Sequence, residues 1–338
     1  GPAKFFLNDL ESRGSRTAVE VTGSIRPVPL EWSYRETTLL ESINDLIQMN
    51  RAPIYIVHFT QKAAAERAQA LTSLDVLTRE EKQRIREEIS SFRFDSPFGK
   101  DVARFVKAGI GVHHAGLLPK YRLLVERLAQ EGLLKLICGT DTLGVGVNVP
   151  IRTVLFSQLC KFDGHETAIL TVRDFQQIAG RAGRKGFDNQ GFVWCQAPEH
   201  HVENLKALQK AADDPKKRRK VQRKRPPERG YAHWDEKTFE RLRVGHPEVL
   251  SSTFRVSHSM LLNVLDRPGD GCAALRRILT DNHESRPQQR IHIRQAIGMY
   301  RSLVSAGIVE TLDKPDTQNR LVRVNIDLQA EFDLTGAL

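Results

Sequence analysis

Cysteine is scarce in this sequence, and long apolar runs are missing. The cysteines are Cys138, Cys160, Cys195 and Cys272, and no two of them form a C-x-x-C pair. Neither a zinc site nor a disulfide framework is therefore expected, and a reducing, intracellular, cytoplasmic location is the default expectation. No stretch approaches the roughly 18 consecutive apolar residues of a membrane helix, so we expect no membrane span and no membrane partner.

Two nucleotide-handling motifs are also missing. No G-x-x-x-x-G-K-[ST] segment occurs anywhere in the chain. The only Asp-Glu pair that could act as an acidic box, Asp235-Glu236, follows a tryptophan in a polar stretch with no buried strand before it. These 338 residues therefore lack a complete phosphate-binding active site of the P-loop kind.

The ends of the sequence say little about targeting. Gly1-Pro2 stands where an initiator methionine is expected and is typical of the remnant of a cleaved tag, so residues 1–2 are excluded from the fold. The ending EFDLTGAL has no terminal cap, and we expect it to lead into a further domain.

Positive charge is concentrated in one short run. The chain has a formal net charge of +10. Residues 215–229 contain nine Lys and Arg against a single acid, Glu228. Such a block repels itself and cannot bury a core, so it is typical of a flexible linker that could track phosphates. A merely solvated spacer explains the same composition, and both readings remain open.

Short apolar runs alternate with amphipathic segments between Thr38 and Cys195. Capping boxes at Thr38/Glu41 and Thr78/Glu81 each predict the start of a helix. Strands are expected at IYIVHF (54–59), GIGVHH (109–114), LKLICGT (134–140), TVLFSQL (153–159) and GFVWCQ (191–196). The predicted fold class is therefore α/β, a parallel sheet with helices on both faces.

Three polar segments are candidates for a ligand site. They are Thr60-Gln61, the glycine-rich stretch 140–150, and the arginine-containing stretch 176–191. Ligands of parallel sheets bind at the carboxyl ends of the strands, in the loops that follow. We therefore expect the three segments to converge on one edge of the sheet.

The stretch QQIAGRAGRKGFDNQG places Arg181 and Arg184 three residues apart, so on a helix they would share a face. Planar, permanently charged guanidinium groups suit bidentate contact with phosphate oxygens. The alternative, two surface arginines on a solvated helix, is disfavoured by Gly180 and Gly183, which weaken a helix that nothing approaches closely. Both side chains are expected to face a triphosphate. If they were buried in a local salt bridge, or turned away from the edge where the glycine-rich stretch emerges, this interpretation would fail.

Three ordered motifs resemble those of superfamily 2 helicases of the Ski-type DExH-box group. They are GVHHAGLLP (111–119), TDTLGVGVNVP (140–150) and QIAGRAGRKGFDNQG (177–191), and IYIVHFTQ corresponds to the strand and loop of motif IV. The resemblance covers about residues 30–200. It implies a second RecA-like lobe at 36–200, preceded at 3–35 by the tail of a first lobe that is absent here and a crossing segment, and followed by a basic linker at 201–250.

The resemblance also implies roles for individual residues. ATP with Mg²⁺ would lie between two lobes, the first holding the metal. Arg184 resembles the arginine finger, Arg181 its partner on the phosphates, and Gln177 the motif VI glutamine. The other expected cofactor-binding residues are Asp141, Gly144 and Gly146. The residues expected to contact or support a nucleic-acid strand are Thr60, His113, His114, Thr140, Thr142 and Asn148. No metal site is predicted, since adjacent residues on a strand, such as His113 and His114, point to opposite faces.

The sequence beyond the basic run resembles a winged-helix domain, placed at 251–338. Helices are expected near 254–265, 271–280 and 288–306, followed by a hairpin across the turn DKPDTQN. A scaffolding role is favoured over groove reading, since Arg290, Arg294 and Arg301 are too sparse to define a groove-reading surface.

Two functions remain open. The first is the C-terminal half of an ATP-dependent helicase or translocase that moves on single-stranded RNA or DNA, 3′ to 5′ by the family's habit. It would work with its own first lobe, and this chain alone is expected to be inactive. The second is a non-catalytic nucleic-acid-binding platform. Oligomeric state cannot be read from the sequence.

Overall fold

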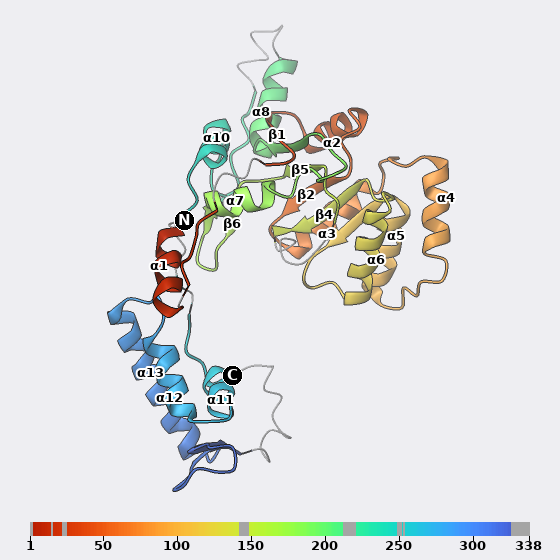
Figure 1. Ribbon diagram of the computed structural model, residues 1–338. Coiled ribbons are helices and arrows are strands. Elements are labelled where there is room, and N and C mark those ends of the chain that lie inside the picture. Colours follow the sequence, from red (N-terminus) through yellow and green to blue (C-terminus); the bar gives the residue numbers. More distant parts are fainter. Residues whose placement is uncertain are drawn as a thin grey trace. The chain divides into compact units, whose positions relative to one another are not determined.

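The computed structural model describes residues 3–14, 16–21, 26–141, 149–211, 221–248, 252 and 254–325 (Figure 1). The chain divides into two compact units, Gly1–Glu248 and Val249–Leu338. The helices of the first unit are α1 (Ala3–Arg13), α2 (Leu39–Gln48), α3 (Gln61–Leu71), α4 (Arg79–Glu88), α5 (Pro97–Lys107), α6 (Pro119–Gln130), α7 (Val172–Ala179), α8 (Glu199–Lys210) and α10 (Glu236–Val244).

The first unit is built on a parallel sheet. Its strands are β1 (Leu30–Arg35), β2 (Ile54–His58), β3 (Ile110–His113), β4 (Leu136–Thr140), β5 (Thr153–Phe156) and β8 (Gly191–Gln196). They lie in the order β1-β8-β5-β2-β4-β3, and each neighbouring pair is parallel. A short antiparallel pair, β6 (Cys160–Phe162) and β7 (Thr167–Ile169), stands apart from this sheet.

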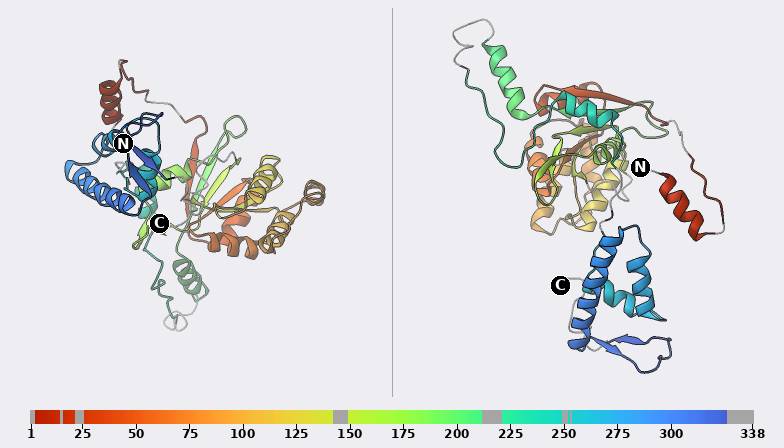
Figure 2. Two further views of the ribbon diagram at one scale, coloured as in Figure 1. Left: turned by 90° about the horizontal axis from the view of Figure 1, so that it is seen from below. Right: turned by 90° about the vertical axis from the view of Figure 1, so that its left-hand side faces the viewer.

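Helices cover both faces of the sheet (Figures 1 and 2). Apolar side chains of α6, α7 and α10 pack on one face, and those of α2 and α3 pack on the other. Every residue of β2, β4 and β8 is buried, as expected of parallel strands covered on both sides. The predicted α/β fold class is confirmed.

Local signals place several of these helices. At Thr38 and Thr78 both halves of the predicted capping box are formed, with Glu41 and Glu81. Pro119 is the first residue of α6, as predicted, and Gly132 follows this helix with a positive φ of 74°.

The first unit is larger than the predicted lobe at 36–200. At its start, β1 pairs with β8 through six residues, so residues 30–35 belong to the sheet and not to a crossing segment. At its end, Trp234, Phe239 and Leu242 are buried against the core. The prediction of a linker over 201–250 is therefore wrong for α8 and for residues 231–244. The linker was predicted from the high charge of residues 215–229, which drew attention away from the apolar residues that follow them.

The second unit has its own core. Helices α11 (His258–Leu265), α12 (Gly271–Thr280) and α13 (Arg286–Ser305) are followed by an antiparallel pair, β9 (Val309–Thr311) and β10 (Val322–Val324). Leu261 and Leu265 are fully buried in this core. Three helices and a hairpin are thus present where the sequence predicted them.

Across the described parts of the chain, we find no helix long and apolar enough to cross a membrane.

Candidate functional site

Helix α7 carries the first part of the predicted arginine motif. The Thr171 side chain caps the helix by accepting a hydrogen bond from the backbone N–H of Asp174. One side of α7 is buried against the sheet through Phe175 and Ile178. Asp174 and Gln177 lie three residues apart, so they share a side of the helix, and Gln177 is exposed.

The two arginines do not share a helical face, so that prediction is wrong. Helix α7 ends at Ala179, and the chain continues through two turns of hydrogen bonding, from Arg181 N–H to Ile178 O and from Ala182 N–H to Ala179 O. Gly183 then adopts a positive φ of 82°, which redirects the chain before Arg184. Residues 181–190 after the helix are called the arginine loop below.

Gly183 is required by packing as well as by conformation. A Cβ atom there would lie 2.6 Å from Val28 Cγ1 and 3.2 Å from the Cα of Gly191. The backbone N–H of Gly183 donates to Ile151 O at 2.9 Å. The predicted close approach at this glycine is therefore made by the protein's own backbone.

Arg184 is held by a local acid. Its Nε and Nη2 donate to the two carboxylate oxygens of Asp188, each at 2.7 Å, and its backbone N–H donates to the same carboxylate at 2.9 Å. The Asp188 side chain is 2% exposed and that of Arg184 is 27% exposed. Arg152 Nε lies 3.6 Å from Oδ1 of the same Asp188 carboxylate. Arg184 is therefore held in a local salt bridge, the arrangement that speaks against its facing a triphosphate.

This pair shifts the pKa of both partners. Burial alone would raise the pKa of Asp188, but hydrogen bonds from Arg184 and the nearby charge of Arg152 lower it below its usual value. The hydrogen bond to Asp188 raises the pKa of Arg184. Both groups are therefore fully charged near neutral pH.

The arginine loop lies at the opposite edge of the sheet from the other predicted segments. Gly183 bonds to Ile151, just before β5, and Gly191 opens β8, so the loop is at the amino ends of the strands. Thr60 and Thr140 lie at or just beyond the carboxyl ends of β2 and β4. The predicted convergence on one edge is wrong for Arg184, because a helix that returns the chain between parallel strands ends where the next strand begins.

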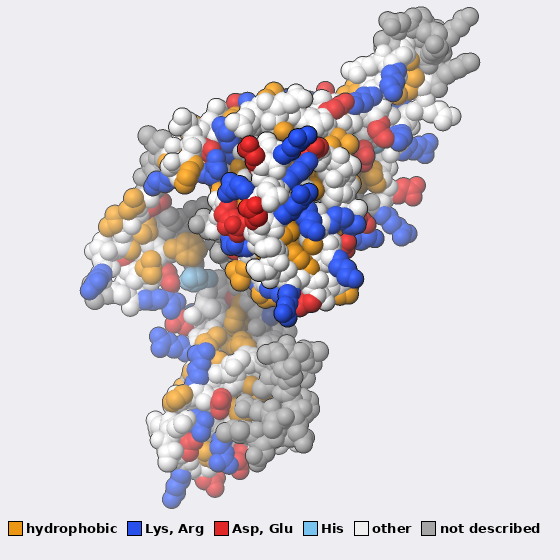
Figure 3. All heavy atoms as spheres, turned by 90° about the vertical axis from the view of Figure 1, so that its right-hand side faces the viewer, with side chains coloured by type: hydrophobic (Ala, Val, Ile, Leu, Met, Phe, Trp, Pro, Cys, Tyr) orange, Lys and Arg blue, Asp and Glu red, His pale blue; other side chains and the backbone are white. Residues whose placement is uncertain are grey.

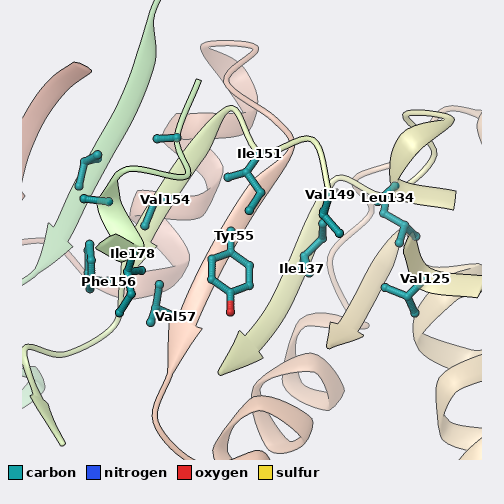
Figure 4. Packing of buried hydrophobic residues seen from close by; sticks show 14 of the residues in the cluster. Tyr55, Val57, Val125, Leu134, Ile137, Val149, Ile151, Val154, Phe156 and Ile178 are labelled. Carbon is teal, nitrogen blue, oxygen red and sulfur yellow. The ribbon is translucent and has the colours of Figure 1, made fainter. Parts of the chain in front are cut away.

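Arg181, the first residue of the arginine loop, lies within electrostatic reach of Tyr55. Its charge acts on the Tyr55 hydroxyl and partly offsets the burial and the nearby Asp141 that raise the pKa of Tyr55. Tyr55 lies among apolar residues of β2, β4 and β5, with its hydroxyl directed toward the carboxyl ends of the strands (Figure 4). The hydroxyl donates to the backbone oxygen of Thr140. Arg181 and Asp141 are thus both within electrostatic reach of one buried hydroxyl.

Lys161 links Asp141 to α7. Its Nζ lies 3.4 Å from Asp141 Oδ2 and 2.9 Å from Asp174 Oδ2. Burial lowers the pKa of Lys161, but the two carboxylates outweigh burial and raise it. The predicted cofactor residue Asp141 is therefore already neutralised by a lysine that the motif analysis did not single out.

Arg26 fixes the arginine loop from a distant part of the chain. Its Nε donates to Val28 O at 2.7 Å, and its Nη2 donates to Gly180 O at 3.0 Å and to Ala182 O. These two carbonyls follow the end of α7, where backbone acceptors have no partner within the helix. One guanidinium group therefore holds the backbone on both sides of Arg181.

The predicted strand contacts are placed unevenly. Thr60 is exposed, and its hydroxyl accepts a hydrogen bond from Ala63 N–H as the N-cap of α3. Thr140 is only 6% exposed. Thr142, Gly144, Gly146 and Asn148 lie outside the described residues.

The two histidines of the HHAGL segment are buried, so any part they play in nucleic-acid binding would be one of support. His113 is 3% exposed and its Nε2 lies 2.9 Å from Glu126 Oε1 of α6; His114 is 6% exposed and packs near Phe98. Burial lowers the pKa of both rings, so they are neutral at physiological pH. Among the residues that the structure describes, no three His, Cys, Asp or Glu side chains gather into a possible metal site.

On the face of the protein shown in Figure 3, groups of Lys and Arg side chains lie beside smaller groups of Asp and Glu side chains.

Comparison with known proteins decides the family. Residues 39–186 match the family "Helicase conserved C-terminal domain", and residues 197–338 match a "Domain of unknown function (DUF3516)". The chain is 35% identical over 188 residues to Exosome RNA helicase MTR4 of Homo sapiens. It is 31% identical over 237 residues to Superkiller complex protein 2 of Homo sapiens and 30% identical over 232 residues to Antiviral helicase SKI2 of Saccharomyces cerevisiae.

The chain carries a helicase C-terminal domain of the Ski-type superfamily 2 group. These alignments cover 53%, 68% and 67% of the chain but only 18%, 16% and 16% of the respective relatives. The sheet and α7 of this helicase portion fall within or close to the matched range, whereas the basic run and the second unit fall in the range of unknown function.

Several residues of the helicase portion were missed by sequence reasoning. A signal existed for Asp188, which lies four residues after Arg184 in the same motif. None existed for Arg26, whose partners are 154 and 156 residues away. The positions of Lys161 and Asp174 depend on how a hairpin and a helix pack, which the motif alone does not contain.

Proposed function

We propose that this chain forms the second lobe of an ATP-dependent helicase or translocase that acts on single-stranded RNA, moving 3′ to 5′. The observation that carries the proposal is the match of residues 39–186 to the helicase C-terminal domain, together with relatives whose names identify them as RNA helicases. In the full-length protein a first lobe would hold the phosphates and the metal, and the second unit here would act as a winged-helix scaffold.

The residues of α7 and the arginine loop fit one side of such a nucleotide site. Gln177 offers an exposed amide, and Arg181 offers a guanidinium whose backbone is held by Arg26. Asp141 and Asp174 both form ion pairs with Lys161, so neither is proposed as a metal ligand. ATP would supply the phosphoryl group, while these residues bind and orient it.

Arg184 can act as an arginine finger only if it exchanges Asp188 for phosphate. Phosphate oxygens accept the same bidentate hydrogen bonds as a carboxylate. Arg152 lies 3.6 Å from Asp188, so the carboxylate would keep a cationic neighbour when Arg184 leaves. The exchange would therefore not leave the buried Asp188 carboxylate without a cationic partner. An unpaired buried charge is the usual energetic cost of breaking a buried ion pair.

The test uses the full-length protein with both lobes present. We expect Arg184→Ala and Arg181→Ala each to lower RNA-stimulated ATP turnover by about 10³-fold or more, the range for arginine fingers, while nucleotide binding is largely kept. Arg84→Ala is the matched control, since Arg84 is exposed on α4 and belongs to no motif. The present chain alone should show no turnover.

Near-normal turnover in Arg184→Ala would remove the finger assignment. The Arg184–Asp188 pair favours the alternative, a non-catalytic nucleic-acid-binding platform in which this arginine is structural. That alternative predicts RNA binding by the full-length protein with no ATP turnover. Side-by-side stimulation by RNA and DNA decides the substrate.

A further inference from the structure

The sheet has a topological switch point between β2 and β5. These strands are neighbours, yet β2 leads into α3 on one face and β5 leads by way of the β6–β7 hairpin into α7 on the other. A crevice forms at the carboxyl ends of such strands, where their connections part, and ligands of parallel sheets bind there. His58 ends β2 at this point, and Ser157 and Gln158 directly follow β5.

The described part of the basic run forms one wall of this crevice. The Asn204 side chain of α8 bonds to both the backbone N–H and the backbone oxygen of Lys224, at 2.7 and 2.9 Å. Lys224 Nζ lies 2.6 Å from Glu203. Trp234 then anchors the segment by donating from its Nε1 to Gln196 O at 3.0 Å. Residues 224–234 are therefore anchored at both ends, to α8 at Lys224 and to the end of β8 at Trp234.

The result is a groove of about 820 Å³, within the size range of small-molecule sites. It is lined by α3, α8, the strand ends and residues 224–234, and we call it the switch-point groove. Arg67, Arg225 and Arg229 line it and have no ion-pair partner in the described chain. The acids that line it are Glu66, Glu199 and Glu203, of which Glu203 is neutralised by Lys224 and Glu66 lies 3.8 Å from Lys62.

His58 forms part of the groove and has unmet hydrogen-bonding capacity. It is 5% exposed, and its Nε2 has no hydrogen-bond partner in the described structure. Burial, with a smaller effect from the charge of Arg67, lowers the pKa of His58 to about 4, so the ring is neutral at physiological pH. A buried polar atom without a partner is costly, and a bound ligand or a water would relieve that cost.

Aromatic side chains line the same groove. The rings of Tyr231 and Trp234 have centroids 5.2 Å apart, and His200 meets Tyr231 edge to face at 5.4 Å. Tyr231 is only partly buried, so its ring is available for stacking. Cations beside aromatic rings are the combination by which proteins hold nucleotides, phosphate on the arginines and base on the ring.

We propose that the switch-point groove binds a nucleotide unit, with its phosphate at Arg67, Arg225 and Arg229 and its base stacked on Tyr231. The same chemistry is presented by a free mononucleotide and by a nucleotide within a single strand. The site is separate from α7 and the arginine loop. The inference does not rest on the proposed helicase function, because nucleotide binding to this groove can be measured in the absence of ATP hydrolysis.

The experiment measures binding to the 338-residue chain by titration calorimetry with AMP, inorganic phosphate and a short single-stranded oligoadenylate. AMP is expected to bind more tightly than inorganic phosphate because its base can stack. We expect Arg67→Gln with Arg229→Gln to weaken the binding of AMP or oligoadenylate by about tenfold or more, since charged hydrogen bonds are lost. Tyr231→Leu should remove the advantage of AMP over phosphate.

The matched control is Arg84→Gln with Arg86→Gln, which removes the same charge from the exposed side of α4. It should change affinity by less than about twofold. Equal weakening in both double variants would mean general electrostatic attraction and would overturn the site, as would equal affinity for AMP and phosphate. Binding of oligoadenylate but not AMP would assign the groove to a strand, whereas equal binding of both would assign it to mononucleotides. Circular dichroism on each variant verifies the fold.

Discussion

Asp188 controls the state of Arg184. Its carboxylate takes three hydrogen bonds from Arg184 and lies beside Arg152, so one buried acid organises two cations. Arginine in a polar loop is ambiguous from sequence, because a motif shows which residues are present and not which of them pair within the protein. The same guanidinium geometry that suits phosphate also suits a carboxylate four residues away.

Replacing Asp188 by Asn should lower the free energy of unfolding by about 1–3 kcal/mol, because it leaves Arg184 without its charged acceptor. The effect depends on pH. The pKa of Asp188 is lowered in the folded state, so its contribution is complete above the ordinary carboxyl value of 3.8 and is lost as the pH falls through the lower folded value. Denaturant unfolding of both proteins between about pH 7 and pH 3 measures this. A gap that stays constant down to pH 3 would contradict the pair's contribution.

At the scale of elements, sequence signals were reliable where the chemistry is local. Both capping boxes formed, and Pro119 starts α6 as predicted. The arginine motif was misjudged because its glycines indicated a close approach but not which group makes it. At Gly183 the neighbouring groups are Val28 and Gly191, which are distant in sequence. Such contacts follow from tertiary packing and leave no local pattern.

Two glycines of the arginine loop separate backbone strain from packing. Gly183 and Gly186 both have positive φ, 82° and 85°, but only Gly183 has neighbours that a Cβ atom would meet. Gly186→Ala should therefore destabilise the chain by roughly 1–2 kcal/mol from strain alone, and Gly183→Ala by distinctly more. Thermal unfolding measures both. Equal losses would show that Val28 and Gly191 yield to the methyl group at no cost.

At the scale of the whole molecule, the alternation of strands and helices predicted a parallel sheet. It did not predict which strand lies at the end of the sheet or which loops lie at the amino ends of the strands. Alternation determines that the strands are parallel and covered. It does not reveal that β1 joins β8, nor that the loop after α7 places Arg184 at the amino edge. The basic run hid the apolar anchor Trp234, so the extent of the first unit required the structure.

The two units have separate cores and should lose their structure separately. Leu261 is fully buried in the second unit and Leu155 in the first. Each Leu→Ala change should cost about 2–5 kcal/mol through the cavity it leaves. Calorimetry should show Leu261→Ala lowering one transition and Leu155→Ala lowering the other. A single transition shifted by either change would mean that the units unfold as one.

Arg26 makes the chain ahead of β1 a tether for the arginine loop. Its guanidinium grips Gly180 and Ala182, the residues that bracket Arg181. If this segment moves away from the sheet, either the two hydrogen bonds from Arg26 to these carbonyl oxygens break or Arg181 moves with the segment. A displacement of the chain before β1 would therefore change the position of the Arg181 charge.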